Sequence, residues 1–331
     1  MVEIRTATIE PIRNTFDHVA SVLGGDKPAS RYLEGTLKLQ SEANFHYQAL
    51  WDKEHALYDP ARTKIVMGDW YKFLDPRQFH YGAYTNARSR QQEAAESNFA
   101  FVEKRNLLQF VDEAARAKMA RVLIPLRHYE WGANMNNSFV ASFAYGSMLN
   151  VPATFHAMDR LGIAQYLTRI GLLLGGVETI DEGKEAWIDH KAWQGLRKVI
   201  EDLFVEKDWF EVFMAQNFVG DGLVYPLVYR QFVQDIGVQG STVAMLAEFM
   251  SDWFDETSKW VDAVVRIAAA ESPQNRQQLS AWYGKWRGLL VDALRPIAAE
   301  LMGSTEATLE TVTSLLDARA KKLGIDAGGA Q

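Results

Sequence analysis

The sequence contains no cysteine among its 331 residues. Disulfides, thiolate nucleophiles, iron–sulfur ligation and cysteine-type zinc sites are therefore excluded, and the composition suits a reducing cytoplasm. Basic runs are also missing, and acidic residues outnumber basic ones by 42 to 35, which gives a formal net charge of −7. Proteins that neutralise many phosphates carry clustered lysine and arginine, so nucleic acid is not an expected partner.

Long apolar runs are a second absence. The most strongly apolar stretch, residues 170–177, is far shorter than the roughly 20 residues that a membrane-spanning helix needs. Residues 1–16 contain no apolar segment of signal-peptide length. We therefore expect a soluble cytoplasmic protein with no membrane partner.

The common catalytic motifs are missing as well. The chain has no glycine-rich dinucleotide or triphosphate loop and no Gly-x-Ser-x-Gly nucleophile turn. A ferritin-like di-iron centre uses Glu-x-x-His on two helices and one further Glu on each of two others, and no Glu-x-x-His occurs here. The seven histidines also lack the His-x-x-x-His and His-x-x-His spacings of helical metal sites. We expect no cofactor in this chain.

What the sequence does contain is a 48% hydrophobic fraction arranged mostly in helical patterns. Apolar spacing and capping residues predict helices over residues 150–176, 193–203, 241–272 and 309–323. Ser241 is the expected N-cap of the third helix, and Gly324 is expected to end the last. No alternating strand pattern and no repeat is present, so the predicted fold class is all-α, a large bundle of long helices.

The N-terminal quarter of the chain has a different character. Residues 1–85 contain four prolines, show no sustained helical period and concentrate aromatic side chains between Phe45 and Tyr84. We expect an extended, loop-rich arm over 1–85, a helical domain over 86–324 and a flexible tail over 325–331. The alternation around Arg77, Phe79 and Tyr81 predicts either a short strand or an extended strap.

Four regions of the sequence together carry a family resemblance. They read DWY and DPRQF at 69–71 and 75–79, PLRHYEWGANMNN at 125–137, AMDRLGIAQY at 157–166 and KDWFE at 207–211. Over nearly its full length the chain closely resembles the β subunit of the hydroxylase component of bacterial phenol hydroxylases, relatives of the toluene and methane di-iron monooxygenases. In the catalytic subunits of that family the helix corresponding to 159–165 reads Asp-Glu-x-x-His-x-Gln.

The resemblance implies a ferritin-like, ribonucleotide-reductase-like bundle and a non-catalytic role inside a larger enzyme. An α subunit would carry the di-iron centre, and this β subunit would support it in an (αβγ)2 assembly. A reductase with FAD and an iron–sulfur cluster would supply electrons from NADH, and a small regulatory protein would gate the chemistry. The complex is expected to hydroxylate phenol and related aromatics to catechols with O2, and a toluene-type monooxygenase is the alternative.

Two residues stand at the places of the lost metal ligands. Arg160 replaces the Glu of the family helix, and Ile163 replaces the His. Isoleucine has no lone pair for a metal and a guanidinium repels one, so we expect neither a metal nor a catalytic residue here. If Arg160 points into the bundle, its charge takes over from the metal cation and pairs with an acidic group such as Glu130 or Glu248.

Two less favoured readings remain open. His128, Glu130, His156 and Asp159 would form an irregular metal site if they converged, since His156 and Asp159 are one helical turn apart. A free-standing helical oxidase with unusual ligands would need such a site, because oxygen activation requires a metal, flavin or haem. A helical scaffold unrelated to oxygenases would require the matched segments to be coincidental.

The aromatic N-terminal segment also suggests a partner interface. Aromatic and arginine side chains are enriched in interface cores, so the segment could form an arm laid across the α subunit. The candidate residues are Trp70, Tyr71, Phe73, Arg77, Phe79, Tyr81 and Tyr84. The equally weighted alternative is that these aromatics cap the chain's own helices.

Overall fold

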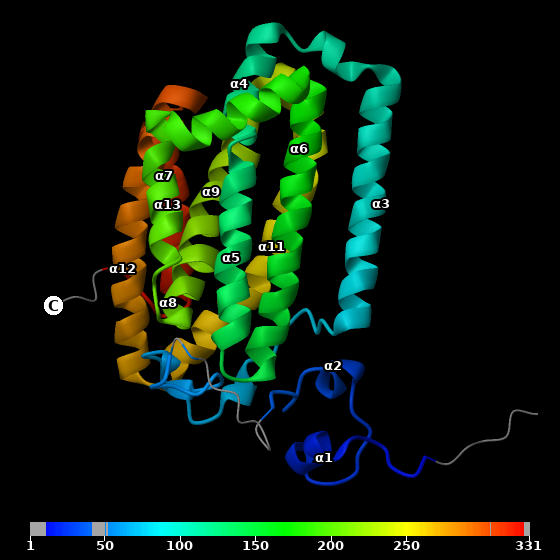
Figure 1. Ribbon diagram of the computed structural model, residues 1–331, viewed down its shortest axis with the longest axis vertical. Coiled ribbons are helices and arrows are strands. Elements are labelled where there is room, and N and C mark those ends of the chain that lie inside the picture. The colour runs from blue at the N-terminus through cyan, green and yellow to red at the C-terminus, as the bar shows by residue number, and fades with distance from the viewer. Residues whose placement is uncertain (1–10, 42–49, 51, 305, 328–331) are drawn as a thin grey trace, which may run out of the picture.

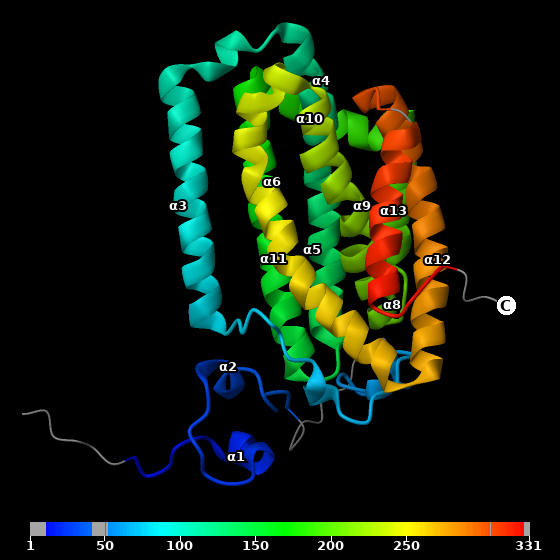
Figure 2. The same cartoon turned by 180° about the vertical axis from the view of Figure 1, so that it is seen from behind.

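The computed structural model describes residues 11–41, 50, 52–304 and 306–327. Every regular element within these ranges is helical, and the prediction of an all-α bundle is confirmed. Figures 1 and 2 show long helices standing side by side, with α1, α2 and the following loops below one end of the bundle. The long helices are α3 (Tyr81–Arg105), α5 (Leu126–Phe143), α6 (Ser147–Asp189), α11 (Ser241–Glu271), α12 (Pro273–Pro296) and α13 (Glu306–Lys322).

Shorter helices connect and cap the bundle. They are α1 (Asp17–Leu23), α2 (Arg31–Glu34), α4 (Glu113–Leu123) and α7 (Lys191–Leu203), with single 3-10 turns at Pro60–Arg62, Trp70–Lys72, Leu107–Phe110 and Gly237–Gly240. No helix in the described part of the chain is long and apolar enough to cross a membrane. The amphipathic helices predicted from sequence are present, with one correction: Gly240 is the N-cap of α11, and Ser241 is its first helical residue.

A buried helical segment that the sequence did not reveal lies between α7 and α11. It consists of α8 (Trp209–Phe213), α9 (Asp221–Tyr225) and α10 (Val233–Asp235), joined by π-helical turns at Met214–Gly220 and Pro226–Phe232. From Trp209 to Val233 almost every side chain is buried. A helix that is covered on all sides has no polar stripe, and π turns shift its period, so no amphipathic pattern marks it.

The N-terminal boundary and the tail also differ from expectation. α3 begins at Tyr81, so the helical bundle starts before residue 86, and no strand forms around Arg77. The tail is anchored at its start, because Ile325 is buried and its N–H donates to the Ala320 carbonyl. Part of the predicted arm and the last four residues, 328–331, lie outside the described residues, and so do Phe45, Tyr47 and Trp51.

The long helix α6 is broken at the predicted glycine pair. Gly175 has φ −165° and ψ 17°, and Gly176 has φ 80° and ψ −160°, after which the helix resumes and ends at Asp189. The backbone of Gly176 lies in a region that only glycine occupies readily. The glycine pair therefore ends the first helical segment where the sequence predicted, but a second segment follows directly.

Replacing Gly176 with alanine is expected to destabilise the protein by about 1–3 kcal/mol, because a Cβ strains this positive-φ conformation. Gly288→Ala in α12 is the matched control, since nothing in the described structure lies within 4 Å of its Cβ position. That control should be neutral or stabilise by up to about 1 kcal/mol through helix propensity. Urea unfolding measures both, and equal midpoints for the two variants would contradict the strain.

Candidate functional site

The guanidinium of Arg160 on α6 is a positive charge buried at the centre of the bundle. None of its surface is exposed. Its Nη1 donates to Glu130 Oε2 on α5 at 2.9 Å and to the Tyr225 hydroxyl on α9 at 3.1 Å. Its Nη2 donates to Asp221 Oδ2 on α9 and, at 3.1 Å, to His156 Nε2. Three helices therefore direct polar groups at a single cation.

Aromatic residues complete the surroundings of this guanidinium. The ring of Trp253 on α11 faces it, with 4.6 Å between the guanidinium carbon and the ring centroid, which is a cation–π contact. The Tyr225 hydroxyl donates to Glu130 Oε1, and the Tyr129 hydroxyl donates to Asp221 Oδ1, both at 2.8 Å. Each carboxylate thus accepts hydrogen bonds on both oxygens, as buried charges require.

Two carboxylates share this one cation, and their pKa values move in opposite directions. Burial raises the pKa of Glu130 to about 7, against the lowering effect of Arg160. Burial also acts to raise the pKa of Asp221, but Arg160 and His156 outweigh it and hold that pKa below its ordinary value. Burial, and then Arg160, lower the pKa of His156 to about 4, so its ring is neutral at pH 7. The proton on Glu130 therefore sets the charge of the cluster near neutral pH.

The arrangement does not fit a metal ion. A guanidinium lies between the two carboxylates, and Ile163, one turn further along α6, places a fully buried apolar side chain on the same helix. No group of three or more His, Asp and Glu side chains in the described ranges is arranged to hold a metal. The carboxylates already have a cation, so these residues support structural electrostatics rather than metal chemistry.

Of the two acidic partners considered for Arg160, Glu130 contacts it and Glu248 does not. Glu248 is exposed on α11, so the expectation for this residue is wrong, and the second carboxylate is Asp221. Asp221 was missed because its helix was missed. The sequence signal that could have indicated Asp221 is that it is the single aspartate within the strongly apolar stretch 209–233.

The irregular metal site considered from sequence is not assembled either. His128 stacks on Trp187 with ring centroids 5.9 Å apart, and burial lowers its pKa to about 4. Asp159 belongs to a second cluster, in which it accepts from Arg88 Nε and Nη2 of α3, both at 2.7 Å, and from Trp253 Nε1 at 2.8 Å. These bonds join α3, α6 and α11.

The sequence model of the methane/phenol/alkene hydroxylase family matches residues 51–272. The chain belongs to this family. It is 48% identical to the phenol 2-monooxygenase oxygenase component DmpL of Pseudomonas sp. (strain CF600), over 98% of both chains. It is 26% identical to the hydroxylase component β subunit of the toluene-4-monooxygenase system of Ectopseudomonas mendocina, over 72% of this chain and 73% of that one.

A solved hydroxylase structure shares the whole fold. A chain of xenon-pressurised phenol hydroxylase from Pseudomonas sp. OX1 superimposes with a TM-score of 0.92 and 44% identity, covering 99% of this chain and 100% of that one. The predicted ferritin-like bundle of this hydroxylase family is therefore confirmed.

The aromatic residues considered for an interface mostly serve this hydroxylase chain's own core. Four of the seven are buried, namely Trp70, Phe73, Phe79 and Tyr84. Tyr71 is half-buried, the Arg77 side chain is only 5% exposed and pairs with Asp75, and Tyr81, at the start of α3, is 69% exposed. The alternative that these side chains cap the chain's own helices accounts for the buried four, which leaves Tyr81 as the member most accessible to a partner.

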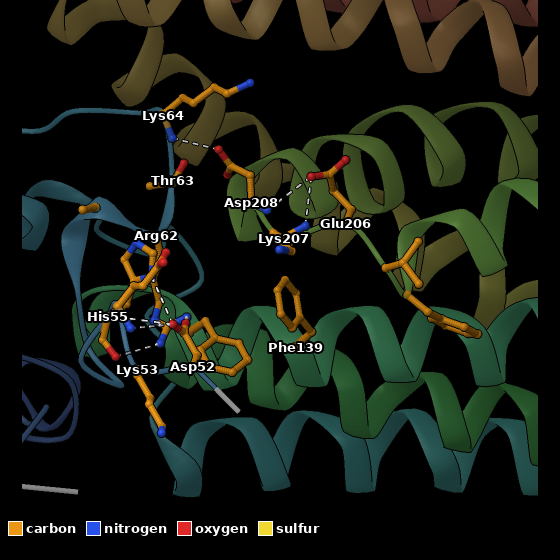
Figure 3. Close-up of a pocket in the computed structure, with 15 residues that line it drawn as sticks. Asp52, Lys53, His55, Arg62, Thr63, Lys64, Phe139, Glu206, Lys207 and Asp208 are labelled. Carbon is orange, nitrogen blue, oxygen red and sulfur yellow. Dashed lines mark hydrogen bonds and ion pairs between the residues drawn. The ribbon is translucent and has the colours of Figure 1, made fainter. Parts of the chain in front are cut away.

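An open hollow of about 730 Å³ lies where the loop after residue 51 meets α5 and the segment between α7 and α8 (Figure 3). Arg62 Nη1 lies 2.7 Å from Asp52 Oδ2, and the main-chain N–H of Lys64 donates to Asp208 Oδ2 at 2.8 Å. None of the residues around Arg160 lines this hollow. The Arg62–Asp52 pair lies within the loop, and the bond from Lys64 to Asp208 ties the loop to the bundle.

Proposed function

We propose that this chain is the non-catalytic, structural β subunit of a di-iron phenol hydroxylase. The observation that carries the proposal is the buried Arg160 guanidinium, held between Glu130 and Asp221 on the helix where the family's catalytic subunits have a metal-binding Glu. A fixed cation of this kind can hold α5, α6 and α9 together without a metal. The 48% identity to a phenol 2-monooxygenase oxygenase component supports the assignment.

In this proposal the chemistry belongs to the complex. An α subunit holds the di-iron centre that activates O2, a reductase with FAD and an iron–sulfur cluster delivers electrons from NADH, and a regulatory protein gates the reaction. The β chain supports α within an (αβγ)2 assembly. Its own residues contribute packing and charge pairing, and none of them is assigned to the reacting atoms.

A toluene-type hydroxylase is the second candidate. The comparison that bears on it is quantitative: 26% identity over 72% of the chain for the toluene-4-monooxygenase β subunit, against 48% over 98% for the phenol 2-monooxygenase component. This difference favours phenol and related aromatics as substrates of the complex.

Iron analysis tests the non-catalytic assignment. The isolated chain, incubated with Fe(II) and desalted, is expected to retain only background iron, because Arg160 repels a metal cation from the carboxylates. The same chain co-purified with a phenol hydroxylase α subunit should carry iron in proportion to α. Stoichiometric iron in the isolated chain would contradict the proposal and would make the chain a candidate catalyst.

A further inference from the structure

Over residues 131–142 of α5 and 154–168 of α6, the outward face forms a surface without charge. The two helices pack against each other, and the Asn134 side chain donates to the Ala157 carbonyl at 2.7 Å. Figure 1 looks onto this pair with α11 behind it, and Figure 2 shows α11 in front from the opposite side. Across residues 131–142 and 154–168, every charged residue that occurs is buried, so none contributes to the outward face.

Large apolar side chains occupy this uncharged face. Trp131 and Met135 on α5 are 52% and 45% exposed, and Met158 and Leu161 on α6 are 48% and 45% exposed. Charged residues make up 23% of the whole chain, so their absence from the outward surface of residues 131–142 and 154–168 is a local property. Depletion of charge together with exposed aromatic and methionine side chains is the composition of an interface core.

Gly162 provides a second, independent observation on the same face. It lies within α6 between exposed Leu161 and exposed Gln165, and an added Cβ would meet nothing within 4 Å in the described structure. Glycine inside a helix is unfavourable relative to alanine, and this chain gives it no packing reason to be there. A bare backbone on an exposed helix suits the close approach of another chain.

We propose that the face formed by Trp131, Met135, Met158, Leu161 and Gly162 docks against an uncharged pair of long helices on the larger, metal-bearing subunit of the hydroxylase. This inference rests on the proposed function, and it adds which surface of this chain binds the metal-bearing subunit. Two parallel ridges of side chains fit the grooves of another helix pair.

The size and charge of the face favour a different chain over a second copy. Residues 154–168 of α6 span roughly 21 Å at 1.5 Å per residue, and two helices side by side cover roughly 20 Å, so the projected area is about 400 Å². A stable interface buries about 800 Å² per partner. A larger partner can extend the contact over Phe204 and Val205, which are 43% and 78% exposed and lie beside Trp131. Two copies of this chain would repel each other, because each carries a net charge of −7.

Leu161→Glu and Gly162→Leu test the surface in the full chain co-expressed with its α subunit. Both positions are open in this chain, so thermal melting of the isolated variants should stay near wild type. Association with α, measured by sedimentation of the purified subunits, should weaken roughly tenfold or more, because one change buries an unpaired charge and the other blocks close approach. Leu315→Glu, at an exposed apolar residue of α13, is the matched control and should associate as wild type does; Figure 2 shows α13 in the view from behind, opposite to the view onto α5 and α6.

The outcomes separate the two levels of the proposal. Normal association of wild type, Leu161→Glu and Gly162→Leu alike would overturn the assignment of this face while leaving the subunit role standing. A wild-type dimer of the isolated chain that Leu161→Glu dissolves, with α binding unchanged, would assign the face to a second copy instead. Failure of the wild-type chain to bind any phenol hydroxylase α subunit would overturn the proposed function itself.

Discussion

Arg160→Met is expected to destabilise the protein by about 3–5 kcal/mol, because it leaves two buried carboxylates without their cation. Methionine has similar length and suits an apolar interior, so lost packing contributes little. Glu130 and Asp221 are fully enclosed by the bundle, and water cannot replace the guanidinium without opening it. Urea unfolding of the full chain at pH 7.5 measures the change in the free energy of unfolding.

A neutralised triple variant separates charge from shape in this experiment. Arg160→Met combined with Glu130→Gln and Asp221→Asn removes the cation and both anions together, and it should recover at least half of the lost stability. Arg160→Lys keeps the charge without the two-sided fork that reaches both carboxylates, and it should fall between wild type and Arg160→Met. A single Arg160→Met variant within about 1 kcal/mol of wild type would show that the carboxylates do not depend on this cation.

The sequence predicted α6, α7, α11 and α13 because apolar spacing and capping residues mark each of them. α7 shows the principle: Trp193, Leu196 and Ile200 are spaced by three or four residues, and all three are buried. The break in α6 was also predictable, since two successive glycines disfavour helix and Gly176 adopts a positive φ. Apolar spacing along the sequence is enough to predict a helix when one side of that helix faces solvent.

The segment from Trp209 to Asp235 could not be recognised in the same way. From Trp209 to Val233 it is enclosed by α5, α11, α12 and α13, so buried and mostly apolar side chains occupy every side of the helix and its period gives no orientation. This failure explains why the partner of Arg160 was sought in Glu248 on α11 instead of Asp221. A buried charge pair depends on which helices become neighbours, and that information lies in tertiary packing.

The aromatic segment before α3 shows a related limit. Its composition is equally compatible with an interface and with a cap on the chain's own core, because both environments remove the same apolar area from water. The structure places Phe73 against Phe210 and Trp70 against Trp209, with ring centroids 6.5 and 5.8 Å apart. The partners belong to the helix that the sequence did not reveal, so this packing could not be predicted either.

The protonation of Glu130 is expected to make stability depend on pH between about 5 and 8. Its pKa rises from an ordinary value of 4.5 to about 7 in the folded protein, so the native state holds a proton that the unfolded chain releases. Its contribution is therefore fully present below pH 4.5, falls as pH rises through the folded pKa and is constant above about 8. The size of the change is on the order of 3 kcal/mol, from 1.36 kcal/mol per pKa unit.

The measurement is the difference in unfolding free energy between wild type and Glu130→Gln at each pH. Gln keeps an acceptor oxygen for Arg160, and its amide N–H can donate to the Tyr225 hydroxyl. His156, whose pKa is lowered to about 4 and whose stability contribution rises with pH up to about 6.5, is common to both proteins and cancels. Wild type should lose stability relative to Glu130→Gln as pH rises from 5 to 8. Asp317→Asn on α13 is the control outside the cluster: hydrogen bonds from Arg287 and Tyr283 outweigh burial and lower the Asp317 pKa, so its contribution disappears only in acid and the difference from wild type should be flat over the same range. A flat difference for Glu130→Gln as well would mean that Arg160 outweighs burial and keeps both carboxylates charged, which would make the cluster a fixed ion pair with no pH response.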